Sequence, residues 1–258
     1  MRDALEPGWV VSDSLTMIGR SLRLSIRNLD ALITAVVLPV MLMLLFVYVF
    51  GGAIDTGTEY VNYVVPGIVL LCTGFGSATT AVSVAADVEE GIVDRFRSMA
   101  ISRSAVLTGH VVASVVRNAF STLVVVLVAV AVGFRPDAGL LPWLGAVGVL
   151  LLWVLAITWV SVCFGLLAGS AEAANGMTFT VLFLPYVSSA FVPVETMPSW
   201  MRPVAEHQPI TPVIETVRGF LLGTPTGTTA WLALAWTVGL LVIAFVAATV
   251  LFGRRTAG

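Results

Sequence analysis

The sequence contains no lysine, since all 13 of its basic residues are arginine. A phosphate-binding P-loop needs a lysine that contacts the nucleotide phosphates, and a Schiff-base enzyme needs a lysine amine, so both classes are excluded. The two histidines, His110 and His207, are too few for a histidine-rich metal site. Cys72 and Cys163 lie far apart in apolar runs, which is typical of small buried residues rather than of a disulfide or a metal pair. We therefore expect no catalytic, cofactor-binding or metal-binding residue in this chain.

Charge is scarce as well. Charged residues make up 11% of the chain and hydrophobic residues 58%, whereas soluble domains carry about 25% charged residues. A soluble core could not bury this much apolar chain, but a lipid bilayer can. The first residues, MRDALEPGWVVSDS, contain no apolar core that would suit a cleaved signal peptide. The net charge of −2 says little about partners; we expect membrane lipid around the chain and no nucleic acid.

Six apolar runs reach or approach the roughly 20 residues that a membrane-spanning helix needs. They are Ala31–Gly51, Tyr63–Ala86, Val106–Gly133, Leu141–Gly169, Met177–Pro193 and Thr229–Phe252. The fifth run is the shortest and contains Pro185, so we expect it to be bent. The sequence thus predicts an all-α membrane protein with six transmembrane helices over residues 31–252. An N-terminal segment 1–30 precedes them, and a short tail 253–258 follows on the same side.

Arginine placement predicts the orientation of these spans, because cytoplasmic segments are enriched in basic residues. With the N-terminus inside, the cytoplasmic segments contain nine arginines: Arg2, Arg20, Arg23, Arg27, Arg95, Arg97, Arg103, Arg254 and Arg255. The opposite side contains three: Arg135, Arg202 and Arg218. We therefore expect both termini in the cytoplasm. The localisation that we expect, the inner membrane of a bacterial cell, follows from the family resemblance given below and not from the arginines.

Arg117 falls inside the third predicted span. A charge at bilayer depth is costly, which makes it by default a candidate for function. Its position near the inner face favours a different interpretation, in which the long side chain snorkels to the membrane surface.

The segment before the first span has the pattern of an amphipathic helix. Apolar residues recur at helical spacing on one arc: Leu15, Ile18, Leu22, Ile26 and Leu29. Basic residues share another arc: Arg20, Arg23 and Arg27. We interpret this segment as an interface helix on the inner membrane surface, with its arginines towards water and lipid phosphates. A basic flank that only sets orientation explains the arginines equally well, but not the apolar stripe.

The segment DVEEGIVDRFRSMAISR, residues 87–103, concentrates charge between the second and third spans. Helical spacing over residues 87–100 places one apolar set on a common arc: Val88, Ile92, Phe96 and Met99. The charged residues that lie almost opposite are Glu90, Asp94 and Arg97. Gly91 costs such a helix about 1 kcal/mol relative to alanine, so it needs support from outside. The helix is either a contact for a soluble partner or a solvated amphipathic linker.

The block Glu195–Gly223 precedes the last span and is too interrupted by proline to cross a membrane. Its prolines predict short helices, since proline suits a first helical turn. In TPVIETVRGFLLG we expect Thr211 as N-cap, Pro212 next and Gly223 as the stop. The block is either a set of short helices at the outer face or an ordinary external loop resting on lipid; the family resemblance described below implies the first, as two short outer re-entrant helices.

Two stretches carry a resemblance to a known family. EEGIVDRFRSMAISRSAVLTGHVVAS (89–114) and SSAFVPVETMPSWMRPVAEHQPITPVIETVRGFLLG (188–223) resemble type-2 ATP-binding-cassette (ABC) exporter permeases of the daunorubicin-resistance-like branch. The residues that match the first motif are Glu89, Glu90, Gly91, Asp94, Arg95 and Arg103. Ala100 stands where the family often has proline, and Gln208 stands where asparagine often precedes the proline.

The resemblance implies a permease subunit without ATPase activity, paired with a second copy of itself and with two copies of a cytoplasmic ATPase that holds ATP and Mg. It assigns ATPase coupling to Glu89, Glu90, Gly91, Asp94, Arg95, Arg97 and Arg103, with Arg20, Arg23 and Arg27 on the interface helix. It assigns an outer gate to Glu195, Trp200, Glu206, Pro209, Pro212, Glu215 and Arg218.

The substrate that this resemblance implies is a hydrophobic or amphipathic compound, a drug or antibiotic first. A lipid, a polyketide or a lipid-linked glycan is the alternative within the same family. An intramembrane enzyme or an ion-coupled carrier is a remote alternative, because the spans lack carboxylates apart from Asp87 at an edge.

Overall fold

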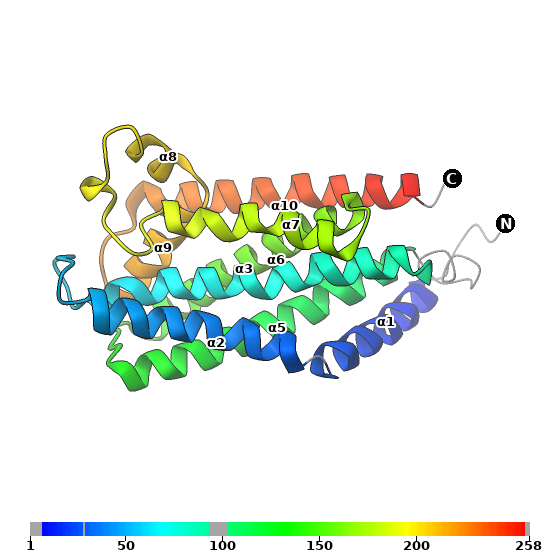
Figure 1. Ribbon diagram of the computed structural model, residues 1–258, viewed down its shortest axis with the longest axis horizontal. Coiled ribbons are helices and arrows are strands. Elements are labelled where there is room, and N and C mark those ends of the chain that lie inside the picture. The colour runs from blue at the N-terminus through cyan, green and yellow to red at the C-terminus, as the bar shows by residue number, and fades with distance from the viewer. Residues whose placement is uncertain (1–6, 28, 93–102, 256–258) are drawn as a thin grey trace.

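The computed structural model describes residues 7–27, 29–92 and 103–255, and every regular element in these ranges is a helix. Long helices lie side by side in a bundle (Figure 1). They are α2 (Leu29–Leu45, continued by the π-helix η1, Phe46–Phe50), α3 (Tyr60–Glu89), α5 (Arg103–Val132), α6 (Leu140–Leu167) and α10 (Gly227–Arg255). The predicted all-α class is therefore confirmed. One end of the bundle carries α1 (Pro7–Arg27) and the last turn of α10, and we call it the α1 end.

Among the described residues, five helical segments are long and apolar enough to cross a membrane. These are Ile33–Phe50, Tyr60–Glu89, Ala105–Val132, Leu140–Leu167 and Gly227–Arg254. The remaining predicted span is broken: α7 (Ala171–Phe183) has 13 residues and passes into a 3-10 helix, η2 (Leu184–Val187), that contains Pro185. Thirteen residues rise only about 20 Å, less than the roughly 30 Å of a hydrocarbon core. Proline ends the α-helix because it has no N–H to donate and its ring clashes with the preceding turn.

Helix α3 is the centre of the bundle and contacts α2, α5, α6, α7 and α9. Glycines permit this close packing. A β-carbon on Gly67 would lie 2.6 Å from the β-carbon of Ala190, and one on Gly165 of α6 would lie 2.6 Å from the Ala81 carbonyl oxygen. Small residues let helix backbones approach closely and gain van der Waals contact, which is the main source of helix association in lipid.

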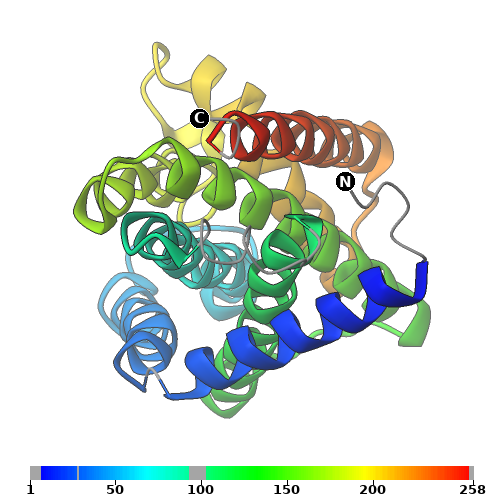
Figure 2. The ribbon, with the colours of Figure 1, turned by 90° about the vertical axis from the view of Figure 1, so that its right-hand side faces the viewer.

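Helix α1 lies across the α1 end of the bundle and packs on α5 (Figure 2). Met17 is buried, and a β-carbon on Gly109 of α5 would lie 2.9 Å from the Met17 carbonyl oxygen. Leu15, which belongs to the predicted apolar stripe, is 63% exposed. An exposed leucine is available for contact with lipid, so the interpretation of this segment as an interface helix stays a prediction.

The predicted helix over residues 87–100 is wrong at its start. Helix α3 continues through Glu89, Glu90 caps it, and Gly91 has a φ of 66°, in the left-handed region where glycine ends helices. Gly91 therefore marks a turn and not the interior of a helix. Ile92 is helical again, and residues 93–102, with Asp94, Arg95 and Arg97, lie outside the described residues.

The opposite end of the bundle, the α9 end, holds the proline-rich block as η3 (Val194–Thr196), α8 (Arg202–His207) and α9 (Ile210–Leu222). Helix α9 is mostly buried and packs against α6, α10 and α3. Gly223 ends it at a φ of 70°, as predicted. The predicted N-cap is wrong, because the helix begins at Ile210 and the Thr211 hydroxyl donates instead to the carbonyl of Ala205.

Candidate functional site

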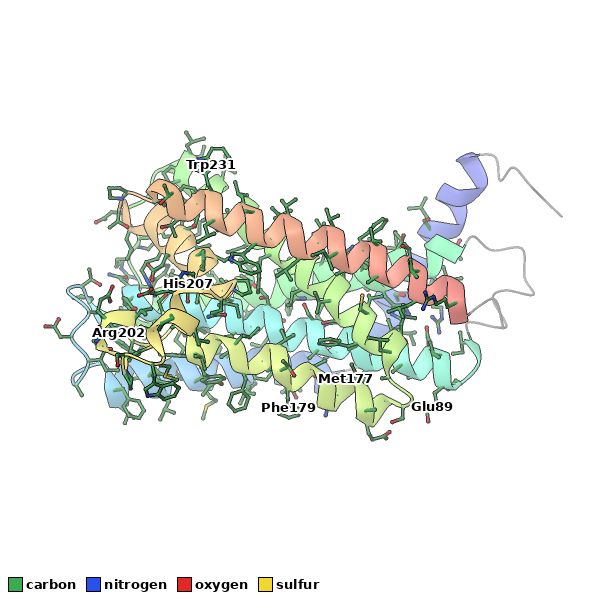
Figure 3. All side chains as sticks on the ribbon, turned by 90° about the horizontal axis from the view of Figure 1, so that it is seen from above. Glu89, Met177, Phe179, Arg202, His207 and Trp231 are labelled. Carbon is green, nitrogen blue, oxygen red and sulfur yellow. The ribbon has the colours of Figure 1, made fainter. Side chains whose placement is uncertain are left out.

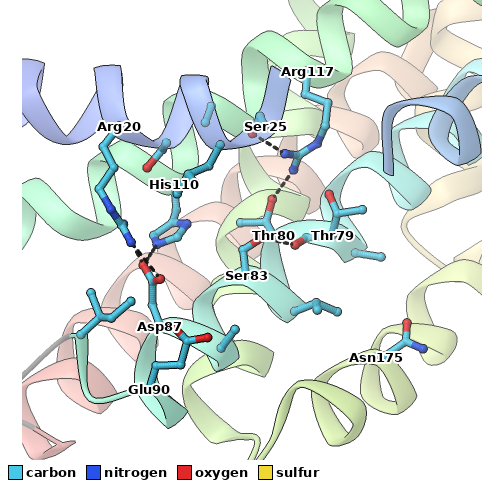
Figure 4. A pocket seen from close by; sticks show the side chains of 17 residues that line it. Arg20, Ser25, Thr79, Thr80, Ser83, Asp87, Glu90, His110, Arg117 and Asn175 are labelled. Carbon is cyan, nitrogen blue, oxygen red and sulfur yellow. Dashed lines mark hydrogen bonds and ion pairs between the residues drawn. The ribbon is translucent and has the colours of Figure 1, made fainter. Parts of the chain in front are cut away.

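Asp87 joins three helices at the α1 end of the bundle (Figure 4). Arg20 of α1 donates from Nη1 to Oδ2 at 3.0 Å and from Nη2 to Oδ1 at 3.2 Å, and His110 Nε2 of α5 lies 3.0 Å from Oδ2. Asp87 itself is 9% exposed. Hydrogen bonds between a guanidinium and both oxygens of a carboxylate are strong and directional. We call Arg20, Asp87 and His110 the Asp87 cluster; it fixes α1 and α5 to the last turn of α3.

Arg117 makes a second link between the same helices. It lies two turns beyond His110 on α5, and its Nη2 donates to the carbonyl of Gly76 at 2.9 Å and to the hydroxyl of Thr80 at 2.8 Å. Nη1 donates to the hydroxyl of Ser25 on α1 at 3.0 Å. Arg117 is 8% exposed, so its side chain bonds to α1 and α3 rather than extending into water.

A cavity of about 740 Å³ opens between α1, α3, α5 and α7, next to both links (Figure 4). Its wall combines the charged groups with hydroxyl-bearing side chains, namely Ser21, Ser25, Thr79, Thr80 and Ser83. Apolar side chains complete it, among them Leu24, Ala78, Val82 and Ala113. The cavity therefore presents a mixed lining suited to an amphipathic molecule.

Glu89 ties the end of α3 to the start of α7, and Figure 3 marks it at this end. Its Oε2 accepts a hydrogen bond from the backbone N–H of Ala171 at 3.3 Å. Ser170 caps the same helix by accepting from Ala173 N–H. Hydrogen bonds from the backbone N–H of Glu172 and from the Ser170 hydroxyl lower the pKa of the Glu172 carboxyl. The resemblance assigns Glu89 to ATPase coupling, and in the structure its carboxylate contacts the start of α7.

The other residues assigned to coupling gather at the same end where they are described. Glu90 is exposed at the end of α3, Gly91 forms the turn after it, and Arg103 begins α5. Arg23 is exposed on α1, and Arg27 is the last residue of that helix. Arg20 differs from the expectation, because it turns to Asp87 instead of to lipid phosphates.

At the α9 end, Arg218 holds together segments that are distant in sequence. It donates to the carbonyls of Tyr63 at 2.9 Å and Ser189 at 2.8 Å, and its guanidinium lies 3.7 Å from the centre of the Tyr63 ring. The expected local pair with Glu215 is present. Arg218 is buried, and its bonds to α3 and to the segment before η3 are features that the local spacing does not reveal.

The remaining residues assigned to the outer gate surround the short helices. Glu195, Trp200 and Glu206 are exposed, Trp200 to 74%. Pro209 precedes α9, and Pro212 lies in its first turn. A second cavity, of about 400 Å³, is lined partly by Glu195, Glu206, Pro212 and Glu215.

Hydroxyl and amide groups connect α3, α5 and α6 within the spans. Asn118 donates from Nδ2 to the carbonyl of Ser114 at 3.0 Å, and the Ser114 and Thr158 hydroxyls lie 3.1 Å apart. The Ser77 hydroxyl lies 3.4 Å from that of Thr158. None of these four groups ionises, so their arrangement serves helix packing and not acid–base chemistry.

Comparison with known proteins identifies the class. The ABC-2 type transporter family matches residues 13–222, and the chain belongs to this family. It is the membrane subunit, or permease, of an ABC transporter, in which nucleotide binding is the task of a partner. The five apolar helices agree with a multi-pass membrane protein.

The relatives are named for drug resistance. The chain is 30% identical over 235 residues to the daunorubicin resistance ABC transporter permease protein DrrB1 of Streptomyces coeruleorubidus, covering 90% of this chain and 83% of that protein. It is 26% identical over 248 residues to the probable doxorubicin resistance ABC transporter permease protein DrrC of two Mycobacterium tuberculosis strains, CDC 1551 / Oshkosh and H37Rv. That match covers 95% of this chain and 90% of the relative. The family suspected from the sequence motifs is therefore confirmed.

Proposed function

We propose that this chain is the permease of an ATP-driven exporter that moves a hydrophobic or amphipathic drug out of the cell. The observation that carries this proposal is the match to drug-resistance permeases over at least 90% of the chain. ATP and Mg bind to the partner subunit in this account.

The proposed assembly contains two copies of this permease and two ATPase subunits in the cell membrane. The α1 end faces the cytoplasm, because six arginines that the sequence places there lie in α1, at the start of α5 and at the end of α10. They are Arg20, Arg23, Arg27, Arg103, Arg254 and Arg255. The sixth crossing consists of α7 and η2, which run from the α1 end towards the α9 end (Figure 1).

The coupling contact in this account is the connection between α3 and α5. The ATPase meets the polar side chains of Glu90, Asp94 and Arg97, and its displacement reaches α3 through the turn at Gly91. The Asp87 cluster then carries the displacement to α1 and α5, and Glu89 carries it to α7. Four helices thus respond together to one contact.

The closure of the exit path is assigned to α8 and α9, which form the two outer re-entrant helices of the proposal. Arg218 supports this role, because it fixes α9 to α3 while Glu195, Trp200 and Glu206 remain exposed. A displacement of α3 would therefore reach the outer block directly.

Co-purification tests the assembly. The tagged full chain, extracted in mild detergent from cells that express it with an ABC ATPase from the same genome, should retain that ATPase at one copy per permease. A stable membrane complex that contains no ATPase subunit would contradict the proposal.

A further inference from the structure

We propose that the cavity beside Arg117 binds the phosphate group of an anionic membrane lipid. The Arg117 guanidinium and the neighbouring serine hydroxyls would donate hydrogen bonds to the phosphate oxygens. This lipid is a bound ligand of the permease and not the drug that it exports.

Two arginines line the cavity. Arg20 pairs with Asp87, whereas Arg117 has no acidic partner among the described residues. Both oxygens of Asp87 are occupied by Arg20 and His110. In the part of the chain that the structure describes, no carboxylate oxygen lies within 4.0 Å of the Arg117 guanidinium. Glu90 is exposed, and it follows Thr80 by ten residues on α3, which is about 15 Å along a helix axis. A positive charge this buried is costly unless an anion accompanies it.

The hydrogen-bonding capacity of Arg117 is also incomplete. A guanidinium has five N–H donors. Nε and Nη2 use theirs on Gly76 and Thr80, whereas Nη1 gives one to Ser25, and its second N–H has no acceptor among the described residues. The hydroxyls of Ser21 and Ser25 line the same cavity. A phosphate oxygen would satisfy this remaining donor and complete a charge-assisted hydrogen bond.

The position of Arg117 favours a lipid over a free anion. Its partner Ser25 lies on α1, eight residues before Ile33, where the first membrane-spanning segment begins. Arg117 thus reaches α1 close to the start of the first span, on the side of the bundle where a lipid headgroup would approach it. Leu24 lines the same cavity and is 52% exposed, so an apolar surface for an acyl chain lies directly beside the polar group.

Native mass spectrometry of the purified full chain tests the proposal. With phosphatidylglycerol added, the wild-type chain should retain one lipid that phosphatidylcholine, whose headgroup has no net charge, does not replace. Arg117→Gln should weaken that retention about tenfold, which corresponds to the loss of one charge-assisted hydrogen bond. The control Arg135→Gln removes an exposed arginine at the α9 end and should bind like the wild type.

Two further variants test the proposal by the same measurement if Arg117→Gln folds poorly. Arg117→Lys keeps the charge and should retain the phosphatidylglycerol with several-fold weaker binding, whereas Ser25→Ala should weaken it with Arg117 intact. Millimolar inorganic phosphate should not displace the lipid; displacement would assign the site to a free anion and overturn the proposal. Equal retention of both lipids by the wild type would overturn it as well.

Discussion

Asp87 is the residue at which the α1 end of the bundle is joined. Two of its contacts are with residues 67 and 23 positions away in the sequence, Arg20 and His110. An ion pair of this kind is costly to break from one side, because Arg20 and His110 would stay partly or fully buried without the carboxylate. The cluster therefore serves as a rigid connection between α1, α3 and α5.

Asp87→Asn tests this connection. The substitution keeps the size of the side chain but removes the charge that Arg20 pairs with, at a cost of about 1–3 kcal/mol. We expect the melting temperature of the purified chain to fall by roughly 5 °C. Glu90→Gln, which neutralises an exposed carboxylate three residues further on, should stay within about 1 °C of the wild type. Equal melting temperatures for the two variants would contradict the role of Asp87.

The sequence identifies many of the polar residues but not their partners. Helical periodicity reports which residues share a face of one helix, and it places the arginines of α1 on one arc. It contains no information on which neighbouring helix covers that face, so Arg20 is assigned to lipid while the structure pairs it with Asp87. Glu215 and Arg218 are the exception, because their spacing of three makes the pair local.

At the scale of the element, α3 depends on close backbone approach. A β-carbon on Gly67 would lie 2.7 Å from Ala190 Cα and 2.8 Å from its carbonyl oxygen, neither of which can move aside as a flexible side chain would. Gly148 of α6 has no atom within 4 Å of the corresponding position. Gly67 and Gly148 therefore allow a matched comparison, because both lie in membrane-spanning helices but only Gly67 has a close neighbour.

Gly67→Ala should destabilise the protein by about 1–3 kcal/mol through overpacking. Gly148→Ala should be neutral or stabilise it by up to about 1 kcal/mol, because alanine is the better helix former. Equilibrium unfolding of both variants in the same detergent measures the difference. A Gly67→Ala protein as stable as Gly148→Ala would show that α3 and the Ala190 segment are not in close contact.

In the proposed function, coupling depends on the connection between α3 and α5. Replacing Glu90 and Asp94 by alanine should leave membrane insertion and ATPase activity intact and reduce drug export several-fold, because the polar contact with the ATPase is lost. The matched control, Glu59→Ala with Asp137→Ala, removes two exposed carboxylates at the α9 end that have no assigned role, and it should leave export unchanged. Unchanged export in the first double variant would place the coupling contact elsewhere.

Element boundaries follow the sequence where a local signal exists. Gly223 and Pro185 stop helices because their backbone requirements are intrinsic, and five apolar runs of sufficient length become continuous helices. The prediction fails at residues 87–91, because the charge pattern hides that α3 extends to Glu89 before Gly91 turns. Amphipathic spacing alone does not separate the last turn of a span from a new helix.

At the scale of the whole molecule, the account places the α1 end in the cytoplasm and the α9 end outside. The native cysteines, Cys72 and Cys163, are buried and give a low background for thiol labelling. An impermeant maleimide should label Trp200→Cys in intact cells, since this position is exposed. Glu172→Cys, also exposed, should be labelled only after the cells are permeabilised. The reverse pattern would invert the topology.

Transport in a reconstituted system tests the central claim most directly. Inverted membrane vesicles that contain this chain and its ATPase partner are supplied with ATP and with daunorubicin, the drug for which one relative is named. The account predicts ATP-dependent accumulation of the drug inside the vesicles, and none when either subunit is missing. Accumulation that is equal with and without this chain, or absent when both subunits hydrolyse ATP together, would contradict it.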